Sequence, residues 1–407
     1  MLQTTPNWQR RTLLFLISQC ITLFGSTLVQ MAIVWYVTLQ TASGLWLAAF
    51  SVCSYLPQFL ISFIGGVWAD RYNRKRLIIL SDGLIAAVTL LMYLIMPYLT
   101  NQPLLLGALL VMSVIRSLGA GVQTPAVNAV LPQLVPAGQL MRYNGLNAAM
   151  QSVVNFAAPA AAGAVLSISS LHTTLLIDVL TAALGIGLFS CLLIPSQAKQ
   201  TAEPTDLWSD LKIGLNYAFK EPLIGRLLMI YGLFVLLCVP AGFMAGLLVS
   251  RIFGSDYWYL TAVELVGFAG MTLGGLLMSI WGGFSSRLRT LASSLACFGL
   301  LAIGLGMSAN FQLYLLLMLL FGIALTCVQT AVTTLIQENA LANIQGRIFG
   351  LMSSMYAGFL PLGMAVFGPL ADIMPLQWLM VASGLGLLGC ALFVRRSKQM
   401  HRTAHSG

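Results

Sequence analysis

Long apolar runs, broken by short polar segments, fill this chain from near its start to near its end. A helix that crosses a bilayer needs about 20 apolar residues. Gly, Pro, Asn and charged residues divide the sequence into runs of that length. The predicted spans are 12–38, 44–68, 77–97, 103–122, 143–167, 172–194, 224–250, 258–282, 290–308, 312–335, 346–370 and 376–395. We therefore expect an all-α membrane protein with twelve transmembrane helices.

Composition supports the same interpretation. Of the 407 residues, 58% are hydrophobic and only 8% are charged, whereas soluble domains carry about 25% charged residues. Twelve spans with short loops use up the chain, so no sizeable soluble domain is expected.

The basic residues predict an orientation. If the amino terminus lies inside, 18 of the 20 Lys and Arg residues fall in inner segments, as cytoplasmic loops of membrane proteins require. The exceptions are Arg116, inside a span, and Arg251, on the outer side. Both termini are therefore predicted to be cytoplasmic, and the net charge of +9 reflects orientation rather than a nucleic-acid partner.

A pattern in the first half of the chain recurs in the second half. The sequence Arg-x-x-Gly-Leu-x-x-x-Met begins at Arg142 and again at Arg347, 205 residues later. Two duplicated six-helix halves are a known transporter architecture with a substrate site between them; chance matching of apolar sequence is the alternative. The predicted organisation is 1–194 and 223–396 for the halves, 195–222 for a linker with an amphipathic helix, and 397–407 for a cytoplasmic tail.

The segment between the second and third spans carries one acid among four bases. Asp70 can cap the N-terminus of a neighbouring helix, where the helix dipole and free N–H groups favour an anion. Such a clasp would hold one conformation shut, and the alternative is a simple inner-side anchor. The predicted gating residues are Gly66, Asp70, Arg71, Arg74 and Lys75. The corresponding second-half segment, 282–289, contains no acid, so the clasp is expected to be asymmetric.

This segment resembles the loop signature of the major facilitator superfamily, Gly-x-Leu-Ala-Asp-Arg-x-Gly-Arg-Lys. Trp68 replaces its Leu and Asn73 its second Gly, and Asn tolerates a left-handed turn. The chain is most similar to macrolide-efflux drug/proton antiporters. The matching segments are 28–33, 115–119, 124–130, 177–180 and 274–277. The resemblance implies the major facilitator fold and proton-coupled export in the bacterial inner membrane, although the antiporter motif of the fifth helix survives only in part, at 158–163.

Four charged residues lie inside predicted spans, where each costs about 2.5–3.5 kcal/mol to insert. Asp178 and Glu264 each lie six residues into a helix that starts outside, one in each half. Both are predicted to carry protons beside a shared cavity; the alternative is that they only fix packing. Asp82 and Arg116 lie at similar depth and are predicted to pair. Both are candidates for proton coupling, the resemblance gives Arg116 a proton-handling role, and the alternative is a purely structural pair.

Polar or large side chains in mid-span are candidates for substrate contacts, with packing or lipid contact as the alternative. They are Gln30, Gln151, Asn155, Tyr231, Met244, Phe24 and Phe268. Prolines inside spans are predicted hinges that face protein or a cavity, because the carbonyls they free need partners. They are Pro57, Pro159, Pro240 and Pro361.

The sequence contains no phosphate-binding loop, nucleophile–base pair or metal-ligand cluster. We expect no enzymatic activity, no cofactor and no metal. The predicted function is a monomeric, proton-coupled antiporter that exports bulky hydrophobic drugs such as macrolides. The alternatives are export of an endogenous metabolite, such as a siderophore or lipid, and a non-transporting membrane receptor or channel.

Overall fold

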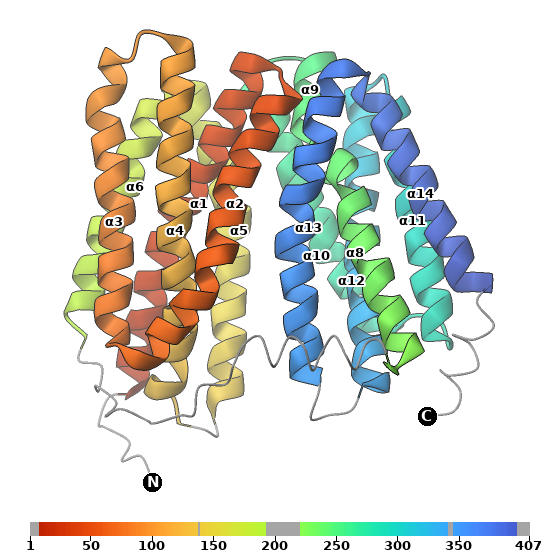
Figure 1. The fold of residues 1–407 in the computed structure, drawn as a ribbon, viewed down its shortest axis with the longest axis horizontal. Helices are drawn as coiled ribbons and strands as arrows, with labels where there is room; N and C mark the ends of the chain where they lie inside the picture. The colour runs from red at the N-terminus through yellow and green to blue at the C-terminus, as the bar shows by residue number, and fades with distance from the viewer. Residues whose placement is uncertain (1–7, 137–138, 193–219, 341–344, 397–407) are drawn as a thin grey trace. The chain divides into compact units, whose positions relative to one another are not determined.

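The computed structural model describes residues 8–136, 139–192, 220–340 and 345–396, and all regular structure in these ranges is helical. The elements, shown in Figure 1, are α1 Trp8–Thr41, α2 Gly44–Arg71, α3 Arg74–Ile95, the short 3₁₀ helix η1 Met96–Tyr98, α4 Gln102–Leu134, α5 Leu140–Ile168, α6 Leu171–Ser190, α8 Pro222–Gly242, α9 Ala245–Ile252, α10 Tyr257–Trp281, α11 Arg287–Met307, α12 Phe311–Asn339, α13 Gln345–Ile373 and α14 Leu376–Arg396.

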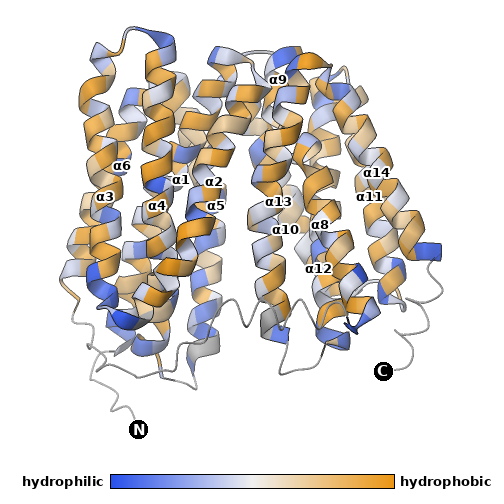
Figure 2. Ribbon diagram, in the orientation of Figure 1, coloured by the Kyte–Doolittle hydropathy of each residue, from blue (hydrophilic) through white to orange (hydrophobic). Residues whose placement is uncertain are grey.

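Within the described ranges, twelve helical stretches are long and apolar enough to cross a membrane. Hydrophobic residues dominate these helices along their length (Figure 2). The predicted all-α class with twelve spans is therefore confirmed. The predicted linker helix lies within residues 193–219, outside the described part of the chain, and the predicted tail lies outside it as well.

Two elements differ from the prediction. Helix α4 continues to Leu134, whereas the predicted span ends at 122, because the polar residues beyond 122 line a cavity or bond to another helix rather than forming a loop. Gln123 Nε2, for example, donates to Asp82 Oδ1 over 2.6 Å. The seventh span is divided into α8 and α9, and the break at Phe243 and Met244 lies just beyond Pro240 in the last turn of α8.

The chain forms two compact units. The first unit contains Met1–Gln40 and Ala49–Ala202, hence most of α1 and α2 together with α3 to α6. The second unit contains Thr41–Ala48 and Glu203–Gly407, hence α8 to α14 and the turn between α1 and α2. The assignment of this turn to the second unit was not expected from the sequence. The exact limits of the predicted halves remain a prediction.

Helix packing within the first unit repeats within the second. In the first, α3 packs on α4 and α6; in the second, α11 packs on α12 and α14, the helices at the same places in a six-helix order. Glycines permit the close approaches of α2 to α4 and of α10 to α12. A Cβ on Gly65 would lie 2.6 Å from the Gly121 carbonyl oxygen, and one on Gly274 would lie 2.8 Å from that of Ile323. Small residues commonly bring membrane helices together in this way, and the repeated packing supports the six-plus-six architecture.

Candidate functional site

A buried ion pair lies in the interior of the first unit. Arg116 of α4 donates through Nη1 to Asp178 Oδ2 of α6 and to Thr89 Oγ1 of α3. The side chains of Arg116 and Asp178 are 7% and 1% exposed. Burying one such charge alone is costly, and the partner offsets that cost only with good hydrogen bonding. Thr89 supplies part of this hydrogen bonding, since its hydroxyl also lies 3.2 Å from Asp178 Oδ2.

The predicted pair between Asp82 and Arg116 is wrong. Arg116 binds Asp178, and the Asp82 carboxylate accepts a hydrogen bond from Gln123 instead. Equal depth in two spans fixes how far along each helix a side chain lies, but not the direction in which it points. Asp82 is buried all the same, so the first unit holds two acids in its interior.

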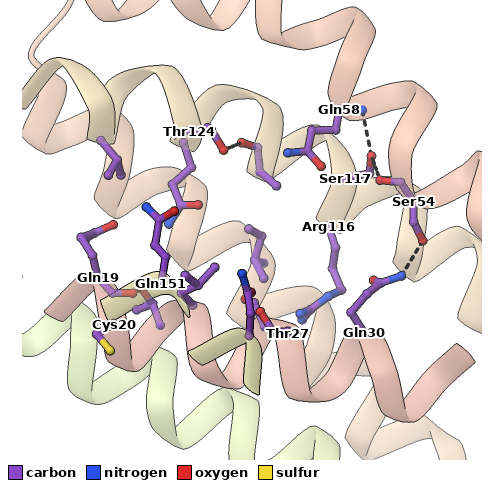
Figure 3. A pocket seen from close by; sticks show the side chains of 18 of the residues that line it. Gln19, Cys20, Thr27, Gln30, Ser54, Gln58, Arg116, Ser117, Thr124 and Gln151 are labelled. Carbon is purple, nitrogen blue, oxygen red and sulfur yellow. Dashed lines mark hydrogen bonds between the residues drawn. The ribbon is translucent and has the colours of Figure 1, made fainter. Parts of the chain in front are cut away.

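A cavity of about 490 Å³ opens within the first unit, between α1, α2, α4 and α5. This volume lies in the usual range for small-molecule sites. The cavity brings together three of the seven predicted substrate contacts, which are Gln30, Gln151 and Asn155. Figure 3 shows side chains from several helices, including Gln30, Gln151 and Arg116, converging on this space.

Polar residues at helical spacing line the cavity. On α5, Asn147, Gln151 and Asn155 follow one another every four residues and thus share one helix face. Sequence reasoning missed several further amides, although their spacing within spans is a usable signal. They are Gln19, Gln58, Gln123, Asn128 and Asn147.

Both buried acids lie one side chain behind this lining. Arg116 lines the cavity and holds Asp178, while Gln123 lines it and holds Asp82. Neither carboxylate is itself part of the described lining. A molecule in the cavity can therefore influence each acid through a single intervening residue.

The predicted hinge Pro57 lies beside the cavity. The Ser117 hydroxyl of α4 accepts from the Gln58 N–H over 2.8 Å and donates to the Ser54 carbonyl over 2.7 Å (Figure 3). These two backbone groups would bond to each other in an uninterrupted α-helix. Backbone groups near Pro57 thus find a partner in a neighbouring helix, as expected for a proline inside a membrane span. The hinge role of Pro57, Pro159, Pro240 and Pro361 remains a prediction.

The other four predicted substrate contacts do not line this cavity. Phe24 lies on α1 outside the lining, and Phe268 lies half-buried on α10 of the second unit. Tyr231 and Met244 are buried inside the second unit, with Met244 fully inaccessible. Packing, the alternative interpretation of these large side chains, fits Met244 best.

Glu264 of α10 is half-buried, and its carboxylate has no hydrogen bond or ion pair with any residue that the structure describes. Asp178 and Glu264 belong to different units. The predicted cavity shared by the two acids therefore remains a prediction.

The predicted gating segment makes contacts inside the first unit. Arg74 donates to the carbonyl oxygens of Ala69 and Ala129, each over 2.8 Å. Lys75 donates to the carbonyls of Ser190 and Leu192 at the end of α6. These bases tie the α2–α3 turn to α4 and α6.

Other residues of this segment add two details. Asn73 does not adopt the expected left-handed conformation; its backbone is extended, and its side chain caps α3 by accepting from the Arg76 N–H. A Cβ on Gly66 would meet no atom within 4 Å, and Arg71 is exposed. The side chain of Asp70 lies outside what the structure describes, so the clasp remains a prediction.

A second cluster of charges, which we call the Asp372 cluster, lies in the second unit. Asp372 of α13 accepts from the backbone N–H groups of Gly44 and Leu45 at the start of α2, and from Ser43 and Arg251. Arg251 also donates to the Ala42 and Ala371 carbonyls. Arg251, which is an exception to the predicted inner-side pattern of basic residues, is thus a structural partner of the α1–α2 turn.

The described ranges contain twelve apolar helices in two similar bundles, with a polar cavity beside buried charges. These features are those of a multi-pass membrane transporter of small molecules. Residues 15–363 match the sequence pattern of the Major Facilitator Superfamily. The chain belongs to this family.

Relatives and a solved structure agree with this assignment. The chain is 26% identical to a protein of Streptococcus pyogenes named Macrolide efflux protein A, over 95% of both chains. It is 21% identical to the Staphyloferrin A transporter of Staphylococcus aureus, over 88% of this chain and 89% of that one. The fold is similar to that of a point mutant of the nucleoside transporter NupG, with a TM-score of 0.71 and 16% identity over 97% of this chain and 99% of that one.

Proposed function

We propose that the protein is a proton-coupled antiporter that exports bulky hydrophobic drugs such as macrolides across the bacterial inner membrane by alternating access. The observation that carries the proposal is the Arg116–Asp178 pair, since Arg116 lines the cavity while its acid lies buried behind it. The similarity to Macrolide efflux protein A supports the cargo class.

The pair offers a way for a proton and a cargo molecule to compete. Ionised Asp178 holds the guanidinium of Arg116 in the cavity lining. A proton on Asp178 removes that counter-charge, and the five donors of the guanidinium then require other acceptors. The nearest supply is the set of amide oxygens around the cavity, which a cargo molecule would also use. Protonation therefore disfavours cargo binding, as antiport requires.

Glu264 has a proposed role in the same cycle. An acid without a bonding partner in a membrane span is costly as an anion and therefore gains by taking up a proton. We assign it proton uptake in the second unit, with the Asp70 clasp closing the predicted inner side when the outer side opens.

Purified full-length protein in liposomes with an imposed pH gradient tests this proposal. The wild type should export erythromycin together with counter-flow of protons, and Asp178→Asn and Glu264→Gln should each lose the gradient-driven flux. Asp256→Asn, at an exposed acid before α10, is the matched control and should retain it.

A second measurement separates lost coupling from lost folding. Asp178→Asn should still exchange labelled for unlabelled erythromycin when no gradient is present, because exchange needs the cavity but no net proton movement. It should need a higher erythromycin concentration than the wild type, since a neutral residue at this position resembles protonated Asp178. Gradient-driven flux that is unchanged in both acid variants would contradict the proposal.

Export of an endogenous metabolite is the second candidate. The similarity to the Staphyloferrin A transporter favours it, as does the number of polar side chains in the cavity. Under this candidate, the same liposomes would transport a siderophore but not erythromycin.

A further inference from the structure

We propose that the first-unit cavity recognises its cargo through hydroxyl, ether and carbonyl oxygens, so that the cargo class is rich in oxygen and a positive charge adds nothing to its binding. This inference rests on the proposed function, because it treats the cavity as the cargo site. A site built for basic drugs would bind the charged amine of its cargo, whereas this inference assigns no part of the recognition to an amine.

The chemistry of the lining is the first argument. Eight of its side chains are carboxamides, which are Gln19, Gln30, Gln58, Gln123, Asn128, Asn147, Gln151 and Asn155. Each carboxamide both donates and accepts hydrogen bonds. Serine and threonine hydroxyls lie between them. Such a surface matches a molecule that alternates hydroxyl and carbonyl groups, because both kinds of group find partners.

The charge of the lining is the second argument. Among the lining residues that the structure describes, Arg116 carries the one formal charge, and it is positive. A buried cation is costly unless an anion pairs with it. The carboxylate of Asp178 is already engaged by Arg116, and the two charges cancel. A cationic cargo would thus lose its hydration without gaining a counter-charge in this cavity.

A buried hydroxyl provides the third argument. Ser113 of α4 lines the cavity and is 2% exposed. Its hydroxyl has no hydrogen-bond partner among the described residues, whereas buried polar groups are nearly always paired. An oxygen of a bound molecule would supply the missing partner, next to the turn of α4 that carries Arg116.

Asp82 is the acid that could weaken this inference. Its carboxylate lies behind Gln123, so its negative charge could attract a cation from one side chain away. If it did, removal of the charge would weaken binding of a basic cargo and leave a neutral analogue unaffected. The test must therefore include Asp82→Asn.

The test compares three probes by equilibrium binding to the purified full-length chain. Erythromycin carries a basic amine, its N-desmethyl-N-acetyl derivative keeps the ring and sugars without that charge, and ethidium is a cation without hydroxyl groups. The neutral macrolide should bind with a dissociation constant no more than threefold above that of erythromycin, in the wild type and in Asp82→Asn. Ethidium should bind at least tenfold more weakly than either.

A gain-of-function variant sharpens the test. Gln151→Glu places a carboxylate in the lining with little change of shape, and it should improve ethidium binding at least tenfold. Asn155→Asp, one helical turn further along, should act in the same direction and provides a second variant if the first fails to fold. Gln312→Glu, at the exposed start of α12, is the matched control and should leave ethidium binding unchanged.

Three outcomes would overturn the inference: a neutral macrolide that binds more than tenfold more weakly than erythromycin, wild-type binding of ethidium as tight as that of erythromycin, or no saturable binding of either macrolide. The proposed function fails separately. If the binding ratios are as expected but liposomes show no proton-coupled flux, the cavity assignment stands and antiport does not.

Discussion

The two units share their helix packing but differ in what they bury. Thirteen of the seventeen buried polar or charged residues in the described chain belong to the first unit, including Asp82, Arg116 and Asp178. The second unit buries four residues of this kind, all with hydroxyl side chains: Thr290, Ser294, Ser308 and Ser383. A duplicated scaffold therefore does not require duplicated chemistry.

The contrast is sharpest at equivalent positions. The offset of 205 that aligns Arg142 with Arg347 also aligns Arg116 with Phe321 and Asp178 with Ser383. Phe321 packs against Phe298 with ring centroids 4.1 Å apart, and Ser383 donates to the carbonyl of its own helix at Met380. Where the first unit holds an ion pair, the second holds an aromatic pair. The ion pair joins α4 to α6, with Thr89 of α3 beside it, whereas the aromatic pair joins α12 to α11 and leaves α14 out. Of these two arrangements, the ion pair alone places a charged group in a cavity lining.

The largest expected effect follows from placing the residues of the second unit, Phe and Ser, at the corresponding positions 116 and 178 of the first unit. Arg116→Phe leaves Asp178 buried without its partner, which should reduce the free energy of unfolding by about 3–5 kcal/mol. The double variant Arg116→Phe with Asp178→Ser removes both charges and should recover most of that loss. Thermal unfolding of the detergent-solubilised variants measures both effects. A double variant as unstable as Arg116→Phe alone would mean that the ion pair is not what distinguishes the two interiors.

The second prediction concerns Asp82, the buried acid of the first unit that accepts a hydrogen bond from the Gln123 amide. Gln123→Leu removes the donor to Asp82 and should cost about 1.5–3 kcal/mol if the acid is ionised. Gln19→Leu is the matched control, because Gln19 lines the same cavity but does not bond to either buried acid. Equal unfolding temperatures for the two variants would show that Asp82 does not depend on Gln123.

The sequence was sufficient to predict the helices and the pseudo-repeat. Apolar runs of bilayer length fix the number of spans regardless of how the helices pack, and the Arg142/Arg347 repeat reveals the duplication. The polarity of Gln123 and Thr124 ended the predicted fourth span too early, because a polar residue in a span is indistinguishable from a loop residue until its partner is known. The break between α8 and α9 lies a few residues beyond Pro240, which was predicted as a bend but not as a point where the helix is interrupted.

The candidate site was predicted only in part, for a related reason. Sequence places Asp82, Arg116 and Asp178 along their helices but gives no rotation of one helix against another, so the wrong acid was paired with Arg116. Gln30, Gln151 and Asn155 were identified because amides in mid-span are rare enough to stand out. Asn147 and Gln58 lie closer to the predicted span ends or beside a proline, where polarity is ordinary.

The third prediction tests charges at the periphery of the second unit against those inside the first. Asp372→Ala removes the acceptor for the Gly44 and Leu45 N–H groups and for Arg251. The side chains of Arg251 and Asp372 are 27% and 30% exposed, so water can replace part of what is lost. We expect a cost of about 1–2 kcal/mol, smaller than that of breaking the buried pair. A loss as large as that of Arg116→Phe would contradict the distinction between interior and peripheral charges.

The smallest expected effect concerns the two corresponding turns, between α2 and α3 and between α10 and α11. Arg74 and Arg287 each donate to the carbonyl five residues earlier, at Ala69 and Gly282. Arg74 then reaches a backbone carbonyl of α4, whereas Arg287 reaches the carboxylate of Glu338 at the end of α12 over 3.2 Å. The acid missing from the second turn is thus supplied by another helix.

This ion pair should contribute little, because its side chains are 42% and 46% exposed and exposed pairs contribute about 0–1 kcal/mol. We expect Glu338→Gln to change the free energy of unfolding by less than about 0.5 kcal/mol, and Arg287→Gln by somewhat more, since it also frees the Gly282 carbonyl. Arg74→Gln should cost more than either, because its acceptors are backbone carbonyls beside the buried core of the first unit. Unfolding measured at low and at high salt separates these cases, since only the exposed pair is screened. If the free energy of unfolding of Glu338→Gln still depended on salt as in the wild type, an interaction other than the Arg287–Glu338 pair would be the cause.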